Sequence, residues 1–367
     1  RRGYFTIEGP GHCAWAACLG LGLTPVSRNA ILLPMKFENE MSRNLSPAEM
    51  AEALRQHPGR LIVTAHVRPD GDALGAALGL ALGLRAGGLD AVCVGVEPVG
   101  TEYAFLDGVA EIVSASDYAP RESDSMVVVD CGDFSRIPEG MRGHAQKRIG
   151  FCIDHHKSNA GFAPLRLIEP AASSSAELVL AVLESGAFPV TRAAAEALWV
   201  GVVTDTGRFS YSCTSPETLR AAARLVECGA RFDEINDRVF GQFDIKRLRL
   251  QKRLLDSLEV SAEGRVSLVS LGPADYAAEN CTYADSDNFV DIARSVRGAI
   301  ISIFLRQVKE GAPINISLRT KPPFDAAEIC AAWGGGGHER AAGASIDGSL
   351  EEIREKIRRE LEAIVSP

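Results

Sequence analysis

Short, unbroken apolar runs that alternate with stretches of helical spacing limit most strongly how this chain can fold. Four such runs lie in its first half, at Leu61–Ala65, Ala91–Val96, Met126–Asp130 and Ile149–Ile153. The helical stretches between and after them lie at Ala73–Arg85, Ser175–Glu184, Arg192–Val203 and Pro216–Cys228. Strands without polar alternation are expected where helices cover both faces of a sheet. Because strands that alternate with helices are typical of α/β folds, we predict a doubly wound, mostly parallel sheet.

A second pattern fills the C-terminal third of the chain. Its predicted strands lie at Arg265–Leu271, Ala299–Arg306, Ile314–Arg319 and Ala341–Ile346, with helices near Asn288–Val296, Phe324–Trp333 and Leu350–Val365. A chain of 367 residues exceeds the size at which single hydrophobic cores usually stop growing. We therefore predict two α/β domains that face each other across a cleft, of which the C-terminal one is smaller.

The predicted domains occupy residues 46–235 and 259–367, and a polar, basic helix at 236–258 connects them. The charges of this connector are most simply a solvated helix face. Residues 1–45 precede the patterned segments. We expect them to be a disordered extension or the product of an over-extended reading frame, because two methionines stand just before the first patterned segment.

The charge and cysteine content exclude several classes of function. A net charge of −9 argues against a protein that coats long nucleic acid, because that task needs a broad basic surface. The nine cysteines are odd in number and form no C-x-x-C pair, which favours a reducing cytoplasm. No apolar run reaches the roughly 18 residues that a membrane span requires, so we predict no membrane partner.

Aspartate and histidine residues gather where the predicted strands and one helix end. They are His66, Asp70 and Asp72 after the first strand, Asp130 at the end of the third, Asp154, His155 and His156 after the fourth, and Asp205 after a helical run. Any one of these aspartates alone is more often a surface or helix-capping group. Because open α/β sheets bind ligands at the carboxyl ends of their strands, the whole set indicates one site.

The residue types at this site indicate its chemistry. Converging carboxylates repel one another and require cations. A mixed set of oxygen and imidazole ligands suits Mn²⁺, whereas Mg²⁺ prefers oxygen and water, and Mg²⁺ or Co²⁺ could substitute. Two ions about 3.5–4 Å apart can hold a hydroxide and clamp the attacking and leaving oxygens of a phosphoryl displacement. The sequence therefore predicts a two-metal hydrolase of phosphate esters.

The ordered set of motifs resembles the DHH phosphoesterase superfamily. The resemblance rests on His66-x-x-x-Asp70-x-Asp72, the strand-end Asp130, Asp154-His155-His156 and Asp205, and on Gly334-Gly-Gly-Gly-His338, which is similar to the GGGH signature of the DHH-associated domain. Family II pyrophosphatases lack this glycine-rich motif, and RecJ-type exonucleases carry a further nucleic-acid-binding module for which this chain is too short. What remains resembles the compact nano-RNase and pAp-phosphatase type.

The resemblance implies a role for each residue of the first domain. One metal ion would be held by His66, Asp70 and Asp130, and the other by Asp72, Asp130, His155 and Asp205. The catalytic residues would be Asp130 as the bridge, His156 pointing at the scissile phosphate, and Asp154, which would orient a histidine ligand.

The second domain is expected to grip the substrate. Arg319 resembles the arginine that binds a substrate phosphate in this family, and a guanidinium fork suits that contact. Gly335, Gly336 and Gly337 would let backbone N–H groups approach a phosphate or base, with His338 beside them. A lone glycine run is more often a flexible linker, but the histidine and the strand that follow it favour binding here.

These observations predict a cytoplasmic, manganese-dependent phosphoesterase. The resemblance implies that its substrates are oligoribonucleotides of about two to five nucleotides, 3′-phosphoadenosine 5′-phosphate (pAp), or both, with mononucleotides and AMP as products. A phosphodiesterase of cyclic or linear signalling dinucleotides could use the same ligands. A nucleotide-binding sensor with a vestigial metal site is the alternative from another class. The sequence leaves a monomer and a homodimer open.

Overall fold

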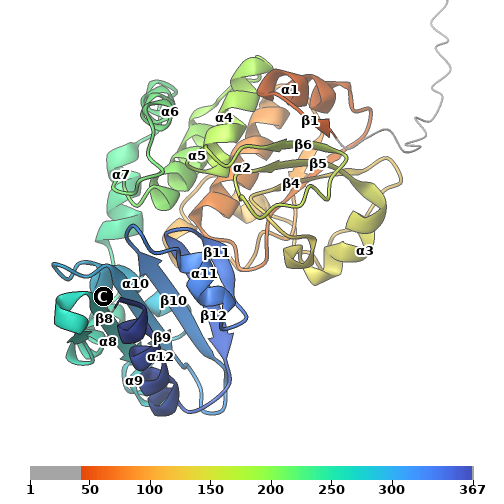
Figure 1. Cartoon of the computed structure of the whole chain (residues 1–367). Helices are drawn as coiled ribbons and strands as arrows, with labels where there is room; N and C mark the ends of the chain where they lie inside the picture. Colours follow the sequence, from red (N-terminus) through yellow and green to blue (C-terminus); the bar gives the residue numbers. More distant parts are fainter. Residues whose placement is uncertain (1–42, 366–367) are drawn as a thin grey trace, which may run out of the picture. The chain divides into compact units, whose positions relative to one another are not determined.

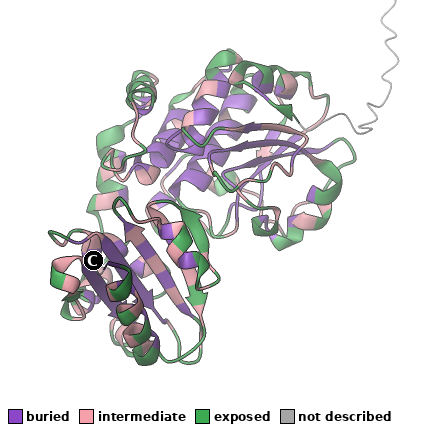
Figure 2. Cartoon of the chain, in the orientation of Figure 1, coloured by how far each residue is buried: buried purple, intermediate pink, exposed green. Residues whose placement is uncertain are grey.

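The computed structural model describes residues 43–365, which form two six-stranded sheets, each flanked by helices (Figure 1). Of the extension predicted at residues 1–45, all but the last three residues lie outside this range. Buried residues run along the central strands of both sheets (Figure 2). Within the described range, no helix combines the length and the apolar character that crossing a membrane requires. The prediction of an α/β fold with two sheets is confirmed.

The first sheet has the strand order β1-β6-β5-β4-β2-β3, and all neighbouring strands in it are parallel. Its strands are β1 (Arg43–Asn44), β2 (Leu61–Thr64), β3 (Ala91–Cys93), β4 (Ser125–Val129), β5 (Ile149–Asp154) and β6 (Leu165–Ile168). The four strands predicted from apolar runs are β2 to β5. Strands β1 and β6 were not predicted, because β1 is very short and polar and Arg166 interrupts the four residues of β6.

Helices cover both faces of the first sheet. One face carries a layer of α1 (Pro47–Gln56), α2 (Gly71–Ala86) and α4 (Ser175–Ser185), on which α5 (Arg192–Asp205) and α6 (Pro216–Glu227) pack in turn, and the other face carries α3 (Glu139–Arg148). Leu61 and Val63 of β2 pack toward the first layer, whereas Ile62 packs with Met141 and Ala145 of α3. Every residue of β2 is therefore buried, which explains why its sequence lacks polar alternation. Short 3₁₀ turns, η1 (Thr101–Tyr103), η2 (Val109–Glu111) and η3 (Phe134–Arg136), lie in the loops.

The second sheet has the order β11-β12-β10-β9-β8-β7, in which only β8 and β9 are parallel. Its strands are β7 (Glu259–Ser261), β8 (Val266–Leu271), β9 (Ile301–Arg306), β10 (Ile314–Thr320), β11 (Gly336–His338) and β12 (Ala341–Ile346). Its helices are α8 (Ile245–Asp256), α9 (Pro273–Glu279) and α10 (Val290–Arg294) on one face and α11 (Ala326–Ala331) and α12 (Leu350–Val365) on the other. The 3₁₀ turns η5 (Ala262–Gly264) and η6 (Ala284–Ser286) complete this half.

The connector helix predicted over 236–258 is interrupted. A short helix, α7 (Phe232–Asn236), runs into a π-turn, η4 (Asp237–Gly241), after which Gln242 is extended. Helix α8 then begins after Asp244, whose side chain accepts a hydrogen bond from the Lys246 N–H and so caps a new helix. Because Leu250 and Leu254 of α8 are buried with Tyr276 and Phe289, α8 is part of the second core. The prediction of one continuous, solvated connector helix is therefore wrong.

Candidate metal centre

The strand order creates a switch point beside the predicted site. The chain runs from β2 outward to β3 and then crosses to β4 on the other side of β2. Ligands of open α/β sheets bind outside the carboxyl ends of the strands at such a point. His66 follows β2 and Asp130 follows β4, so both stand at the switch point. Residues 154–156 lie at the end of the neighbouring strand β5.

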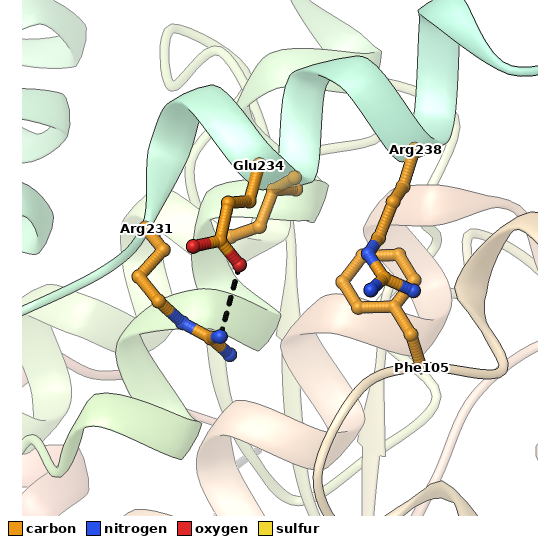
Figure 3. A pocket seen from close by; sticks show the side chains of 5 residues that line it. Phe105, Arg231, Glu234 and Arg238 are labelled. Atoms are coloured by element: carbon orange, nitrogen blue, oxygen red, sulfur yellow. Dashed lines mark hydrogen bonds and ion pairs between the residues drawn. The ribbon is translucent and has the colours of Figure 1, made fainter.

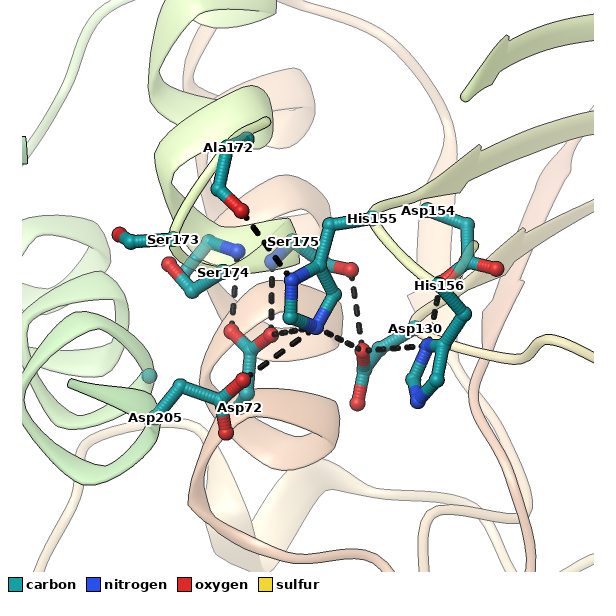
Figure 4. Close-up of polar contacts among 12 residues, drawn as sticks. Asp72, Asp130, Asp154, His155, His156, Ala172, Ser173, Ser174, Ser175 and Asp205 are labelled. Carbon is teal, nitrogen blue, oxygen red and sulfur yellow. Dashed lines mark hydrogen bonds and ion pairs between the residues drawn. The ribbon is translucent and has the colours of Figure 1, made fainter. Parts of the chain in front are cut away.

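Asp130 lies between two groups of side chains. Figure 4 shows its contacts on the side of His155. Its Oδ2 atom is 3.6 Å from His66 Nε2, and its Oδ1 atom is 3.6 Å from His155 Nε2. The backbone of Asp130 is left-handed, with φ of 49°, which is unusual for a residue other than glycine. Strain of this kind costs roughly 1–3 kcal/mol and is found chiefly at functional sites.

Within each of the two groups, the ligand atoms lie at separations that suit metal coordination. Ligand atoms of His66, Asp70 and Asp130 lie within 4.8 Å of one another, and so do those of Asp72, His155 and Asp205. His155 Nε2 is 3.2 Å from Asp205 Oδ2 and 3.8 Å from Asp72 Oδ2. Two atoms that each bind one ion at about 2.1 Å lie about 3 Å apart or slightly more. Six residues predicted as metal ligands therefore converge, and their donor set fits metal ions.

Hydrogen bonds orient the two histidines of these groups. His66 Nδ1 lies 2.9 Å from the carbonyl oxygen of Val67, and His155 Nδ1 lies 3.3 Å from that of Ala172. A carbonyl oxygen can only accept, so both Nδ1 atoms carry the proton. The Nε2 atoms then present their lone pairs to the carboxylates, as metal ligation requires.

The clustered carboxylates of this site need positive charge nearby to offset their mutual repulsion. Asp72 is fully buried and accepts the backbone N–H groups of Ser175 and Ala176, at 2.7 and 2.9 Å. Burial, together with the negative charges of Asp130 and Asp205, raises the pKa of Asp72 well above its ordinary value. Burial lowers the pKa of His155, but the hydrogen bond to Asp205 and the surrounding carboxylates raise it overall. Bound cations would satisfy the same demand.

His156 belongs to a separate chain of hydrogen bonds. Its Nδ1–H donates to Asp154 Oδ1 at 2.8 Å, and the other carboxylate oxygen of Asp154 accepts from Asn159 Nδ2 at 2.6 Å. Asp154 is fully buried. The resemblance implied that Asp154 orients a histidine ligand, whereas here it holds His156, the histidine outside the predicted ligand set.

Sequence reasoning missed two residues of this centre. Ser175 Oγ donates to Asp130 Oδ1 at 3.0 Å, and Asn159 Nδ2 donates to Asp154 and also to the carbonyl oxygen of Cys131, at 3.2 Å. The three serines at 173–175, directly before an apolar helical stretch, signal a helix start and could have drawn attention to Ser175. Asn159 carries no such signal, because asparagine is common in turns.

The predicted substrate residues of the second sheet lie on β10 and β11. His338 ends β11, and its ring stacks on His156 with centroids 4.9 Å apart. Arg319 of β10 is half-buried, and its Nε has no hydrogen-bond partner among the described residues. The structure therefore brings His338 directly to the candidate centre.

The three predicted glycines differ in their surroundings. A Cβ atom at Gly335 would lie 2.1 Å from the carbonyl oxygen of Gly343, and one at Gly337 would lie 2.6 Å from that of Ala341. Packing against β12 thus requires glycine at both positions. A Cβ at Gly336 would meet nothing within 4 Å, so only Gly336 borders open space.

A polar cavity of about 190 Å³ lies away from this centre (Figure 3). Its lining includes Arg231, which pairs with Glu196 at 2.6 Å and Glu234 at 3.0 Å. Arg238 lies over the ring of Phe105, 5.0 Å from its centroid. The Arg231 cation is already neutralised, and we do not assign this cavity a phosphate.

Known proteins match both halves of the chain. Residues 60–202 match the DHH family, N-terminal domain, and residues 271–365 match the DHHA1 domain. A Thermus thermophilus protein described as bifunctional oligoribonuclease and PAP phosphatase NrnA is 33% identical over 318 residues, which cover 85% of this chain and 93% of that protein. The chain belongs to the DHH family. As a DHH phosphoesterase it is a hydrolase of phosphoester bonds, which confirms the prediction.

Further relatives of this DHH protein agree in length and fold. A Bacillus subtilis protein with the same description is 26% identical over 289 residues, covering 78% of this chain and 89% of that protein. The crystal structure of an exopolyphosphatase-related protein from Bacteroides fragilis superposes with a TM-score of 0.79 at 26% identity, covering 86% of this chain and 96% of that one. DHH phosphoesterases depend on metal ions, and the clustered Asp and His residues fit that requirement.

Proposed function

We propose that this DHH protein is a manganese-dependent phosphoesterase with two Mn²⁺ ions. It hydrolyses oligoribonucleotides of about two to five nucleotides to mononucleotides and pAp to AMP. The observation that carries the proposal is the place of Asp130, which has one carboxylate oxygen beside each group of ligands. The names of the Thermus and Bacillus relatives support this choice of substrates.

The proposed ligands divide at Asp130. His66, Asp70 and Asp130 hold one ion, and Asp72, Asp130, His155 and Asp205 hold the other. The mixture of imidazole and carboxylate favours Mn²⁺, with Mg²⁺ or Co²⁺ as substitutes. When bound, the ions supply Lewis acidity and a nucleophile at neutral pH.

The chain's own groups position the substrate. His156, held by Asp154 in its doubly protonated form, donates from Nε2–H to an oxygen of the reacting phosphate and stabilises the charge that develops there. Arg319 and His338 bind a phosphate or base remote from that bond, and the open side of Gly336 admits it. A remote grip of this kind favours substrates with few nucleotides.

We retain residues 46–235 as the catalytic domain and residues 259–367 as the substrate-binding domain. The core position of α8 adds that helix to the second of them. A cytoplasmic location is also part of the proposal, supported by the odd number of cysteines and by the free thiols of the described residues.

The test is hydrolysis by chelator-treated protein after addition of Mn²⁺, Mg²⁺ or Co²⁺. Substrates are pAp, a dinucleotide, a five-mer and a cyclic dinucleotide, with products resolved by chromatography. We expect Mn²⁺ to restore activity best, and the first three substrates to be cleaved. Asp130→Ala should abolish turnover, while Asp133→Asn, a matched change at an exposed carboxylate near the same sheet edge, should not. Near-normal hydrolysis by folded Asp130→Ala protein would refute the two-metal scheme.

A further inference from the structure

Ser175 touches two of the proposed metal ligands at once. It is the first residue of α4 and is fully buried. Its Oγ–H donates to Asp130 Oδ1 at 3.0 Å, and its backbone N–H donates to Asp72 Oδ2 at 2.7 Å. A carboxylate oxygen only accepts, so the hydroxyl is the donor in the first of these bonds.

The hydroxyl fixes how the Asp130 carboxylate is turned. Among the described residues it is the only group within ordinary hydrogen-bond distance of that carboxylate, because the nitrogens of His66, His155 and His156 are all 3.6 Å away. A carboxylate oxygen has two lone pairs, and Ser175 occupies one on Oδ1. The other remains on the side of His155, while Oδ2 faces His66.

The neighbouring serines perform other tasks. Ser174 caps α4 by accepting the N–H of Glu177 at 3.1 Å, and Ser173 Oγ donates to the Glu177 carboxylate at 2.6 Å. Neither of their hydroxyls contacts a proposed ligand. At the start of α4, Ser174 therefore caps the helix, whereas Ser175 contacts Asp130.

We infer that the Ser175 hydroxyl is a positioning group that turns the Asp130 carboxylate so that it bridges two metal ions. The inference rests on the proposed function, since it takes the two ions from it. Without the hydroxyl, the carboxylate can rotate and offer both oxygens to one ion. Residues that orient metal ligands in this way typically contribute about 10- to 100-fold in metal affinity.

The experiment titrates Mn²⁺ into the chelator-treated full chain by calorimetry, and electron paramagnetic resonance distinguishes a coupled manganese pair from single ions. For Ser175→Ala we expect the weaker of the two binding steps to lose about 10- to 100-fold in affinity, with loss of the coupled signal. Ser175→Thr keeps the hydroxyl and should restore both readouts. Ser174→Ala is the matched control and should lower thermal stability while leaving the metal pair intact.

Several outcomes would overturn the inference. One is that folded Ser175→Ala binds the metal pair as tightly as the unaltered protein does. Another is that Ser174→Ala loses as much Mn²⁺ affinity as Ser175→Ala, and a third is that the unaltered protein binds a single ion. If circular dichroism shows that Ser175→Ala does not fold, Ser175→Cys replaces it, because a thiol is a weak donor. Wild-type affinity in that variant would also refute the role. Hydrolysis is measured separately, so a protein that binds the pair through Ser175 but cleaves no substrate contradicts only the proposed function.

Discussion

Asp154 uses both of its carboxylate oxygens within the protein, one for His156 and the other for Asn159. The sequence predicted that this aspartate is functional, because it follows a buried strand and precedes two histidines. It could not show which histidine the carboxylate holds. That depends on the direction in which each side chain leaves the end of β5, and residues adjacent in sequence point to different sides.

Changing Asp154 to Asn should impair turnover while leaving the metal ligands in place. The amide keeps the size of the side chain but is uncharged, so it no longer stabilises the doubly protonated ring of His156, the form that can donate from Nε2–H to the phosphate while Nδ1–H is held. We expect kcat on a dinucleotide to fall by about 10- to 100-fold, with less change in KM. Saturation kinetics, with Asp133→Asn as the control, measure this. An unchanged kcat would contradict the role proposed for His156 in the reaction.

Asp124 illustrates a residue that acts on stability alone. Its carboxylate receives Arg60 at 3.0 and 2.8 Å, the Tyr118 hydroxyl at 2.6 Å and the Arg121 N–H at 2.8 Å. Burial raises the pKa of Asp124, but these hydrogen bonds lower it overall to about 2. The folded state therefore favours the charged form more strongly than the unfolded chain does, in which the pKa is about 3.9.

Asp124→Asn should lower the free energy of unfolding at neutral pH by about 1.5–3 kcal/mol. A depressed pKa contributes stability above the unfolded value, and this contribution is lost as the pH falls through the folded value. The difference between the two proteins should thus be constant above about pH 5 and shrink between about pH 4 and 2. Urea unfolding of metal-free protein at several pH values tests it, with the exposed Asp117→Asn as control. A difference that does not vary with pH would contradict this account.

Helices α2 and α5 pack with their backbones in close approach. A Cβ atom at Gly75 would lie 2.3 Å from the carbonyl oxygen of Ala197 and 2.8 Å from the N atom of Gly201. Asp72 stands in the first turn of α2, and Asp205 is the last residue of α5. The separation of these two helices therefore determines how far apart two proposed ligands of one ion lie.

Gly75→Ala should force the two helices apart, because the clash is with backbone and no side chain can move aside. We expect a loss of about 1–3 kcal/mol in the free energy of unfolding and weaker Mn²⁺ binding. The control is Gly143→Ala in α3, where a Cβ meets nothing within 4 Å. That change should leave stability equal or slightly higher, since alanine is the better helix former. Unfolding and metal titration of both variants test this, and wild-type behaviour of Gly75→Ala would show that the helices can separate without cost.

The elements that were predicted are those with a strong local pattern. Buried strands such as β4 and β8 are unbroken apolar runs, and α12 has a clear apolar stripe. Strand β11 was missed because glycine disfavours strands, and only its ladder with β12 makes it one. The break before α8 was missed although Gly241 and Asp244 are residue types that end and begin helices. That these Asp and His residues converge could be predicted, since most of them follow strand ends, whereas the hydrogen bonds that hold them are set by tertiary contacts.

At the scale of the whole molecule, the site draws on both sheets. The ring of His338, from the second sheet, lies against His156 of the first. A substrate held by Arg319 and His338 at one end has a limited reach to the metal ions. We therefore expect hydrolysis to fall steeply for RNA longer than about five nucleotides, measured as rates across a length series. Equal rates on a dinucleotide and a thirty-mer would contradict this reading.

Arg319→Ala should act on binding of the short substrates. A charge-assisted hydrogen bond is worth about 1.5–3 kcal/mol, or roughly ten- to hundredfold in KM, with a smaller effect on kcat. Lys321→Ala, at an exposed residue just beyond β10, provides the control. If KM on a dinucleotide does not change, Arg319 does not grip the substrate.

The candidate ligands come from the ends of β2, β4 and β5 and from the ends of two helices. Only the assembled sheet brings them together, so the unfolded chain offers few of these donors to a single ion. Each ion that binds then links distant segments and stabilises the folded state. By mass action, this stabilisation depends on the metal concentration. With the proposed manganese ions bound, the resistance of this protein to unfolding would become a property that the cell sets through its manganese supply.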